Sequence, residues 1–488
     1  MLPESQQNPT QSAFPWWKTI LLVFVSLGIG AVAIPHESFW MDEGGPAFKS
    51  LLPTLGDWWK MTLQLRGSDV QMPVYMASLW GWEKIMGNTE FALRAINLPF
   101  LVIMVLALRN VRFWPLVCLT SPFVLYYVGE LRPYAMQMAA GACAAAAIGR
   151  VIRSRAGEFD GLLAVLGSAL FLCACSLTAV VWAGGLMLGM LVIRPDWLKT
   201  KGFWKRCLIY LPAGLAVGGF YAFTLIEGYR ATASGGGGLL SLLFGFYEMA
   251  GLLGLGPSRN ELRASPMALL AQLPWLLPAA GCLFAAWSFG LREWLRNTPR
   301  RVAVGVALAV GTPVVILAVV GWLADFRVLG RHMSPAMPAV LLPICVCLAH
   351  ATVSRPKLVI GTLAILLSLA SAASLRFAGK HARDDYRTAT RLAIEALTRN
   401  QSVLWQADMN TPRYYAFRAG GWPYVNAIQV LESNPPSGFM FADRIFINRP
   451  DIGYKNRNHR ETMKQAAFDL ESSLTGFEVW KNRYTSAP

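Results

Sequence analysis

Charged residues are scarce in this chain. Only 15% of its 488 residues are Asp, Glu, Lys or Arg, whereas a soluble globular domain averages roughly 25%. Hydrophobic residues make up 55% of the chain, and they are concentrated in runs separated by short basic clusters. A bilayer core requires about 20 apolar helical residues. The deficit of charge therefore excludes an ordinary soluble enzyme and predicts a polytopic α-helical membrane protein.

The chain also lacks the cysteine pattern of a disulfide framework. All eight cysteines lie inside or beside apolar runs. Two pairs have CxC spacing, Cys173/Cys175 and Cys345/Cys347, but neither is accompanied by enough His, Asp or Glu for a four-ligand metal site. We therefore interpret the cysteines as small buried apolar residues.

Nucleic-acid binding is a further class that the charge pattern disfavours. The net charge of +16 would suggest such a partner in a soluble protein. Here the Lys and Arg residues lie in short loops between apolar runs, where they determine topology and contact lipid head groups. We predict membrane lipids as partners and no nucleic acid.

The apolar runs predict about eleven spans, beginning with an uncleaved span that ends in "AVA" (31–33). Alternate loops are short and basic, so the positive-inside rule places them and the N-terminus in the cytoplasm and the C-terminal tail outside. The expected spans are 17–35, 91–108, 113–129, 134–149, 161–176, 178–193, 207–226, 269–289, 302–323, 335–352 and 358–376.

The expected organisation is a membrane catalytic domain (1–376) followed by an extra-cytoplasmic α/β domain (377–488). The first outer loop (36–90) contains "GDWWKMTLQL" and "PVYMASLWGWEKIMG", which we interpret as interfacial helices. The outer loop 227–268 contains four consecutive glycines, so it is either a flexible linker or a mobile lid.

The tail is polar, and its pattern alternates between helix and strand, which is typical of a small α/β layer domain. It contains no Gly-rich turn of the nucleotide-binding type. The expected elements are helices at 384–400 and 460–474 and strands at 402–407, 438–448 and 476–484.

An acidic pair, Asp42 and Glu43, follows the first apolar run in "FWMDEGG" (39–45). Ionisable groups near the hydrocarbon are costly and tend to mark function. The pair is either a solvated helix cap or the source of a general base that takes a proton from an acceptor hydroxyl. Because adjacent side chains point in different directions, only one of the two would act directly, and the other would either orient it or contact substrate.

Polar groups also surround Pro73, which interrupts a helical pattern in "SDVQMPVY" (68–75). This segment is either a simple turn or a second set of hydrogen-bonding groups directed toward Asp42. The groups are Asp69, Gln71 and Tyr75.

Two further outer segments carry arginine. The short connection "GELRPYAM" (129–136) contains Glu130, Arg132 and Tyr134. One interpretation is a surface ion pair between Glu130 and Arg132. The other places Arg132 against an anionic head group, for which the guanidinium is well suited.

The segment "DFRVLGRHMSPAMP" (325–338) precedes a predicted span on the outer side and contains Arg327, Arg331 and His332. Positive charge is not needed for orientation on that side. The arginines either extend to the interface along apolar stems or bind a lipid phosphate with their planar donor groups. A carboxylate base and phosphate-binding arginines are together the groups expected in an enzyme that transfers a group from a lipid phosphate to a hydroxyl.

The chain resembles the GT-C fold glycosyltransferases that use polyprenyl-phosphate sugars, which include protein O-mannosyltransferases and lipid A aminoarabinose transferases. The resemblance covers about 36–135 and 320–400. It rests on "WMDEGG", "QMPVY", "SLWGWEKIMGNTEFALRAINLPF", "SPFVLYYVGELRPYAM", "RHMSPAMP" and "RDDYRTAT". The chain departs from the family pattern at Met72, where a proline is frequent, and at His332, where tyrosine is frequent.

The resemblance implies a bacterial inner-membrane enzyme whose site faces the periplasm. Asp42 would be the catalytic base, and Glu43 its neighbour in the donor or acceptor site. Arg132, Tyr134 and Arg331 would surround the donor phosphate, and the transfer would invert the anomeric centre. A divalent cation is used by some relatives and not by others. The acceptor remains open among a protein, lipid A and a polysaccharide.

A transporter or lipid flippase is the alternative from another class, and a non-catalytic scaffold is a third. A transporter should carry ionisable residues near the middle of its spans or inverted repeats, and we find few such charges and no clear halves. The transferase hypothesis predicts that Asp42, Arg132 and Arg331 share one outward-facing cavity, and it fails if they lie far apart or if the cavity opens to the cytoplasm.

Overall fold

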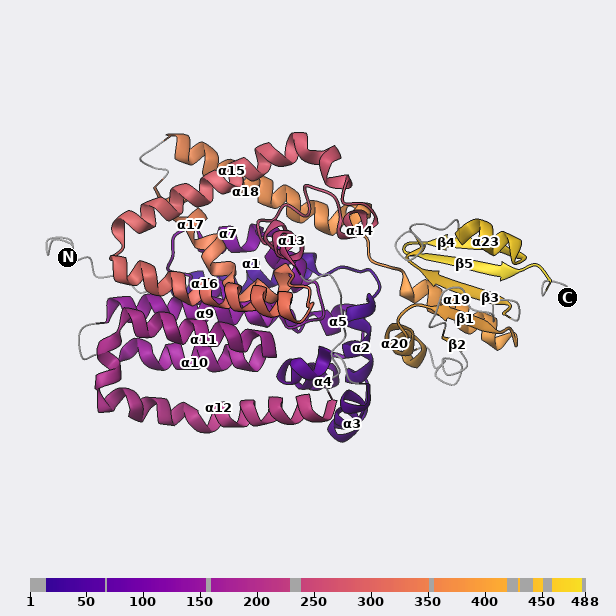
Figure 1. The fold of residues 1–488 in the computed structure, drawn as a ribbon, viewed down its shortest axis with the longest axis horizontal. Coiled ribbons are helices and arrows are strands. Elements are labelled where there is room, and N and C mark those ends of the chain that lie inside the picture. Colours follow the sequence, from indigo (N-terminus) through magenta and orange to yellow (C-terminus); the bar gives the residue numbers. More distant parts are fainter. Residues whose placement is uncertain are drawn as a thin grey trace.

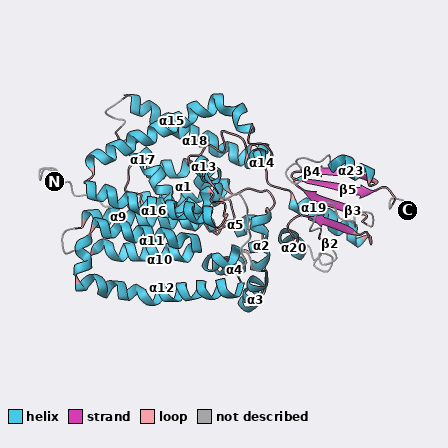
Figure 2. Cartoon of the chain, viewed as in Figure 1, coloured by secondary structure: helices cyan, strands magenta, loops and turns pink. Residues whose placement is uncertain are grey.

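The computed structural model describes residues 15–65, 68–154, 159–228, 238–350, 355–418, 429–430, 442–450 and 459–484. A large helical bundle carries a small sheet domain at one end (Figure 1). Strands are confined to that end of the molecule, and the remainder of the described chain is helical (Figure 2). The glycine run at 235–238, which we interpret as a linker or a lid, lies outside the described residues except for its last glycine.

Within the described residues, eight helices are long and apolar enough to cross a membrane. All eight overlap expected spans, although the helix expected at 207–226 begins at Lys201, the one expected at 269–289 ends at Asn297, and the one expected at 335–352 begins at Gly330. They are Trp16–Ala33, Glu90–Ala107, Tyr134–Arg153, Lys201–Ile226, Ala268–Asn297, Arg300–Leu323, Gly330–Ala349 and Arg355–Phe377. In Figure 1 they correspond to α1 (Trp16–Ala33), α5 (Glu90–Arg94) with α6 (Asn97–Ala107), α9 (Tyr134–Arg153), α12 (Lys201–Gly228), α15 (Ala268–Asn297), α16 (Arg300–Leu323), η4 (Gly330–Ala336) with α17 (Met337–Ala349), and α18 (Arg355–Phe377).

The other three expected spans are shorter helices. Two are α10 (Asp160–Cys175) and α11 (Leu177–Ile193). The expected span 113–129 is wrong as a single helix, because it divides into α7 (Trp114–Thr120) and α8 (Pro122–Val128). Pro122 offers no N–H to continue the first helix, and Ser121 caps the second by accepting from the backbone N of Val124. The prediction of a polytopic helical protein is confirmed.

Helices α9 and η4–α17 form the centre of the bundle, and α1, α12 and α15 lie at its periphery with mostly exposed apolar surfaces. The expected interfacial segments are helices α3 (Leu55–Leu65) and α4 (Pro73–Met86). Trp59 of α3 stacks on Phe220 and Phe223 of α12, with ring centroids 5.2 Å and 5.8 Å apart. This contact lies about 30 Å along α12 from its basic start, given a rise of 1.5 Å per residue, so it is roughly one hydrocarbon thickness away.

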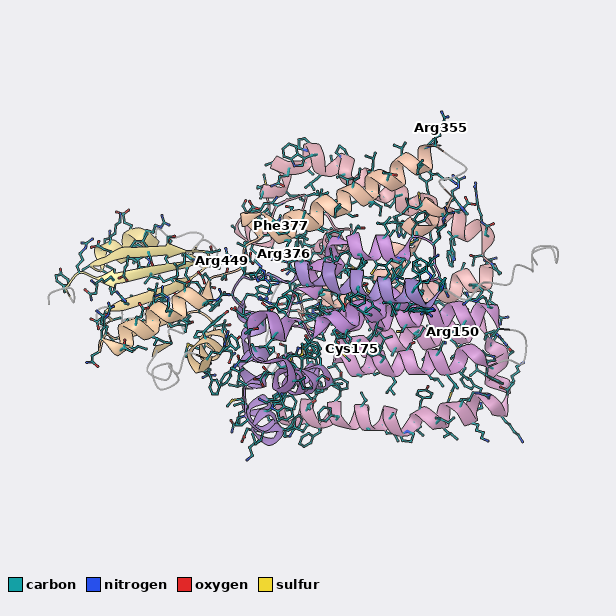
Figure 3. The ribbon with its side chains drawn as sticks, turned by 180° about the vertical axis from the view of Figure 1, so that it is seen from behind. Arg150, Cys175, Arg355, Arg376, Phe377 and Arg449 are labelled. Atoms are coloured by element: carbon teal, nitrogen blue, oxygen red, sulfur yellow. The ribbon has the colours of Figure 1, made fainter. Side chains whose placement is uncertain are left out.

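Two of the residues from the basic loops mark the end of the bundle that lies away from the sheet. Arg150 and Arg355 lie there, whereas Arg376 and Phe377 lie beside the sheet domain together with Arg449 (Figure 3). The structure thus separates one end with basic connections from another end that carries α2, α3, α4 and the tail (Figure 1).

The tail contains a five-stranded sheet in the order β2-β1-β3-β5-β4. Strand β1 is parallel to β2 and β3, and β5 is antiparallel to β3 and β4. The strands are β1 (Val403–Gln406), β2 (Gln429–Val430), β3 (Arg444–Asn448), β4 (Phe468–Leu474) and β5 (Phe477–Asn482), with helices α19 (Tyr386–Thr398), α20 (Asn410–Arg418) and α23 (His459–Gln465).

The expected helix at 460–474 is wrong in its second half. Helix α23 ends at Gln465, and β4 begins at Phe468. Ala467 between them has a φ of 64°, a left-handed conformation that interrupts a helix. A turn at Gly476, with a φ of 74°, then joins β4 to β5, so cross-strand pairing replaces the helical pattern.

The tail packs on the first outer loop through α20, which contacts α2 (Met41–Ser50). The ring of Tyr414 lies edge-on to Phe39 at 4.9 Å, and the hydroxyl of Tyr415 accepts from the backbone N of Phe39 at 2.7 Å. Helix α20 of the C-terminal tail therefore fixes the segment that precedes the acidic pair.

Candidate active site

Helix α2 carries the acidic pair in its first turn. Trp40 is its N-cap residue, and the Glu43 carboxylate accepts from the backbone N of Trp40 at 3.4 Å. Carboxylates are favoured at a helix N-terminus because the helix dipole is positive there. Part of the helix-cap interpretation is therefore correct, but it applies to Glu43, whereas Asp42 faces two arginines.

Asp42 meets two arginines that are candidates for binding a lipid phosphate. Its Oδ2 accepts from Nη1 of Arg331 at 2.9 Å, and its Oδ1 lies 3.9 Å from Nη2 of Arg132. Its side chain remains 30% exposed, so a ligand can reach it. Burial alone would raise the pKa of Asp42, but Arg331 and Arg132 lower it below its ordinary value.

Glu43 has a different environment, because its side chain is fully buried. Nε and Nη2 of Arg94 donate to its two oxygens at 2.9 Å and 2.8 Å, and Arg383 forms a further ion pair. Burial opposes ionisation, yet Arg383 and Arg94 lower the pKa of Glu43 to about 2. The expectation that one carboxylate of the pair orients the other fits this arrangement better than contact of Glu43 with substrate.

Asp69 lies beside the same arginine that approaches Asp42. Its carboxylate accepts from Nη1 of Arg132 at 2.7 Å and forms an ion pair with Lys49 of α2. Burial raises the pKa of Asp69, but Lys49 and Arg132 outweigh it and lower the pKa below its ordinary value. Asp69 lies in the 3₁₀ turn η2 (Ser68–Gln71), so the segment before Pro73 does fold back toward Asp42.

The short connection between α8 and α9 is held by buried hydrogen bonds. Asn97 of α6 donates to the carbonyl oxygens of Val128 and Glu130 at 3.2 Å and 2.5 Å. The hydroxyl of Tyr75 in turn donates to Asn97 at 3.1 Å. Tyr75 thus supports the site from behind. The alternative of a surface pair is wrong, because Glu130 and Arg132 are both buried.

The Glu130 carboxylate has no hydrogen-bond partner among the described residues. Burial raises the pKa of Glu130 above its ordinary value, although Arg259 and Arg383 oppose the shift. Tyr134 begins α9 and is also buried, with its ring 4.9 Å from that of Tyr127. Gln71 is half-buried at the end of η2.

The expected segment 325–338 contains Arg331, which lies in η4. His332 accepts from the backbone N of Leu329 at 3.0 Å through Nδ1 and packs against Phe326 at 4.9 Å. His332 therefore stabilises the turn that presents Arg331. Arg327 lies within electrostatic range of Arg263, on the same side of the bundle.

Sequence reasoning missed several residues of this site. Arg259 of α14 (Arg259–Ala264) donates to Glu248 of α13 (Leu239–Met249) at 2.7 Å and to the hydroxyls of Tyr126 and Tyr127. Glu248 also accepts from the backbone N of Gly330 at 3.1 Å. The capping box of α14 was a local sequence signal for this helix. The other missed residues are Lys49, Arg94, Arg263 and Arg383.

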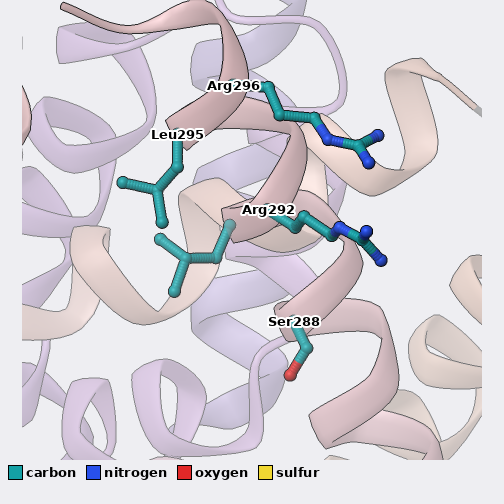
Figure 4. Close-up of a pocket in the computed structure, with 5 residues that line it drawn as sticks. Ser288, Arg292, Leu295 and Arg296 are labelled. Atoms are coloured by element: carbon teal, nitrogen blue, oxygen red, sulfur yellow. The ribbon is translucent and has the colours of Figure 1, made fainter. Parts of the chain in front are cut away.

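Two hollows are present away from these contacts. One, of about 420 Å³, lies on α15 and is lined by Ser288, Leu291, Arg292, Leu295 and Arg296 (Figure 4). Another, of about 290 Å³, lies between α14 and the tail and includes Glu261, Lys380 and Arg449. Neither is lined by Asp42, Arg132 or Arg331. The structure thus brings the three side chains together, but these two hollows do not supply the cavity that we expect them to share.

The residues around Asp42 do not suit a metal ion. Within the described ranges, no three His, Cys, Asp or Glu side chains are grouped as metal ligands. The carboxylates of Asp42, Glu43 and Asp69 are instead directed at arginine and lysine. We therefore assign no step of the reaction to a divalent cation.

The architecture defines the class: a multi-pass membrane protein with the GT-C fold. The chain is similar to the crystal structure of ArnT from Cupriavidus metallidurans in the apo state, with a TM-score of 0.56 and 12% identity over 97% of this chain and 99% of the other. It is also similar to the structure of that protein bound to undecaprenyl phosphate, with a TM-score of 0.53 and 12% identity over 97% and 100%. No protein-family model matches the chain, and no curated protein matches its sequence.

Proposed function

We propose that this chain is an integral membrane glycosyltransferase that moves a sugar from a polyprenyl-phosphate donor to a hydroxyl acceptor at the periplasmic face. The observation that carries the proposal is the placement of Asp42 against Arg331 and Arg132 in a GT-C fold. ArnT, with the same fold, has been crystallised with undecaprenyl phosphate. An inner membrane location with a periplasmic tail follows from the basic loops at the opposite end.

In the proposed reaction, an acceptor hydroxyl oxygen attacks the anomeric carbon and its proton passes to the Asp42 carboxylate. The bond between the anomeric carbon and the phosphate oxygen breaks, and polyprenyl phosphate leaves with the bonding electron pair. Arg331 and Arg132 stabilise the negative charge that develops on this leaving group. Attack from the face opposite the phosphate inverts the anomeric centre.

The ion pair of Asp42 with Arg331 also connects donor binding to the strength of the base. Without donor, the arginines hold the pKa of Asp42 below its ordinary value. A bound phosphate competes for the same guanidinium groups and adds negative charge nearby, which raises the pKa of a carboxylate. Asp42 thereby becomes a stronger base when the donor is in place.

The test compares purified wild type and Asp42→Asn in liposomes that contain defined polyprenyl-phosphate sugars and a panel of acceptors. We expect transfer by wild type and a loss of at least about 100-fold in the variant, the scale of general-base catalysis. Asp469→Asn, a change of an exposed carboxylate in the tail, is the control. Equal turnover by wild type and Asp42→Asn would exclude Asp42 as the base, and no transfer from any donor would contradict the transferase assignment.

A further inference from the structure

Arg383 connects the C-terminal segment to both elements that carry the proposed reacting groups. Its Nη1 pairs with the carboxylate of Glu43 in α2. Its Nη2 donates to the carbonyl oxygen of Gly129 at 3.2 Å, in the connection that carries Arg132. Its side chain is only 9% exposed, so these contacts form in an environment where water competes little.

Glu43 also joins α2 directly to residues 129–133, which connect α8 to α9. Its Oε1 accepts from the backbone N of Leu131 at 2.8 Å. Asp42 precedes Glu43 directly in the chain, and Arg132 follows Leu131 directly. The contact between Glu43 and Leu131 therefore lies one residue from Asp42 in one element and one residue from Arg132 in the other. It sets the separation of 3.9 Å between Asp42 and Arg132.

Arg94 makes a different set of contacts with the same carboxylate. In addition to Glu43, it donates to the carbonyl oxygens of Pro35, Glu37 and Ser38. These contacts fix the loop before α2 and neutralise the buried charge. Arg383 is the arginine whose hydrogen bonds join α2 to the 129–133 connection.

We propose that Arg383 is a positioning residue of the transfer reaction, which fixes the base Asp42 relative to the phosphate-binding Arg132. This inference rests on the proposed function. It makes the start of the C-terminal domain part of the active site. Removing Arg383 should loosen the position of Asp42 relative to Arg132. The donor phosphate can still contact Arg331 and Arg132 separately, because both arginines are retained.

The test uses the full chain with Arg383→Ala, Arg383→Lys and the matched control Arg387→Ala. Arg387 also joins the tail to the bundle, through an ion pair with Glu90 at 2.6 Å, but its side chain is 48% exposed. We expect Arg383→Ala to lower kcat about 10- to 100-fold, the equivalent of one or two charge-assisted hydrogen bonds, with little change in KM for the donor. Lysine should restore part of kcat, because it keeps the charge but not the forked geometry.

Hydrogen exchange at the Leu131 amide supplies a readout that does not depend on activity. Faster exchange in Arg383→Ala, with wild-type exchange in Arg387→Ala, supports the proposal. Wild-type kcat in Arg383→Ala, unchanged exchange at Leu131, or an equal loss of kcat in Arg387→Ala would overturn it. If wild type transfers no sugar, the proposed function fails on its own, and unchanged exchange at Leu131 would still reject the bridge.

Discussion

Gly44 of α2 and Thr411 of α20 are in such close contact that no side chain fits between them. A Cβ atom at Gly44 would lie 2.0 Å from Oγ1 of Thr411 and 2.5 Å from its Cα. The backbone of Thr411 cannot move away freely, because its N–H and hydroxyl both donate to Asp408 at 3.0 Å. The glycine after the acidic pair is thus the point at which the tail approaches α2, the helix that carries the proposed base.

We expect Gly44→Ala to destabilise the protein, since overpacking a close contact typically costs 1–3 kcal/mol. The melting temperature of the detergent-purified variant should fall, and transferase activity should fall with it. Gly81→Ala is the control, because a Cβ there meets nothing within 4 Å and alanine favours a helix by roughly 0.5–1 kcal/mol. Equal melting temperatures for the two variants would contradict the contact.

Arg331→Ala and Arg132→Ala should each weaken binding of undecaprenyl phosphate about tenfold or more, since a hydrogen bond to a charged group contributes roughly 1.5–3 kcal/mol. The change in affinity can be measured by adding the lipid stepwise and following the tryptophan fluorescence of the protein. Arg355→Ala is the control, because Arg355 lies at the far end of the bundle (Figure 3). Wild-type affinity in both site variants would remove the two arginines from the donor site.

Acidification should reduce stability through Glu43. Its pKa falls from an ordinary 4.5 to about 2 in the folded protein, so its contribution is present above the unfolded value and is lost as the pH falls from 4.5 toward 2. Thermal unfolding measured across this range should show the loss, and Glu43→Gln should show a smaller pH dependence. A variant with the wild-type slope would argue against the ionised pair.

The pH dependence of turnover should not reflect Asp42 in the free enzyme above pH 5. Its pKa lies below its ordinary value of 3.8, so Asp42 remains ionised and ready to accept a proton as the pH falls from 7 to 5. We therefore expect kcat/KM to be flat over that interval. A fall in kcat/KM within this interval that moves to higher pH in Arg331→Gln, where the arginine no longer lowers the pKa of Asp42, would show that Asp42 titrates higher than its surroundings predict.

Asp69→Ala should be strongly destabilising, because it leaves Lys49 and Arg132 buried without their carboxylate. Breaking a buried pair by removing one partner typically costs 3–5 kcal/mol. Asp469→Ala is the matched control, because its pair with Arg483 is exposed and such pairs contribute at most about 1 kcal/mol. Similar melting temperatures for the two variants would contradict a structural role for Asp69.

Local pattern was sufficient to predict a polytopic helical protein and to single out Asp42, Arg132 and Arg331, which the structure brings together. Apolar runs report helix length directly, and charges near a membrane are rare enough to identify. The break at Pro122 and the strand β4 were missed for a local reason, since each depends on whether one residue continues or ends a helix. At Ala467 a positive φ ends it, although alanine itself favours helix.

The partners of Glu43 could not be predicted in the same way. Arg94 and Arg383 lie 51 and 340 residues away from Glu43 in sequence. The residues next to an arginine do not indicate which distant carboxylate it will contact. Arg94 occurs within a quoted segment of the family resemblance and Arg383 begins "RDDYRTAT", yet neither position revealed a buried ion pair. Only the packing of the tail against α2 brings the two arginines to the same carboxylate.

The position of Arg383 has a consequence for biosynthesis. Chains are made from the N-terminus and their domains generally fold in order, so α2 leaves the ribosome 340 residues before its second arginine. The described helices from α3 to α18 are made in that interval, while Glu43 has Arg94 as its arginine partner. The contacts of Arg383 with Glu43 and with the carbonyl oxygen of Gly129 form only after the chain has been made as far as Arg383. If Arg383 positions Asp42 and Arg132 as we propose, that arrangement is completed after the spans have been made, and a ribosome that stops before Arg383 releases a membrane protein with its spans and without this bridge.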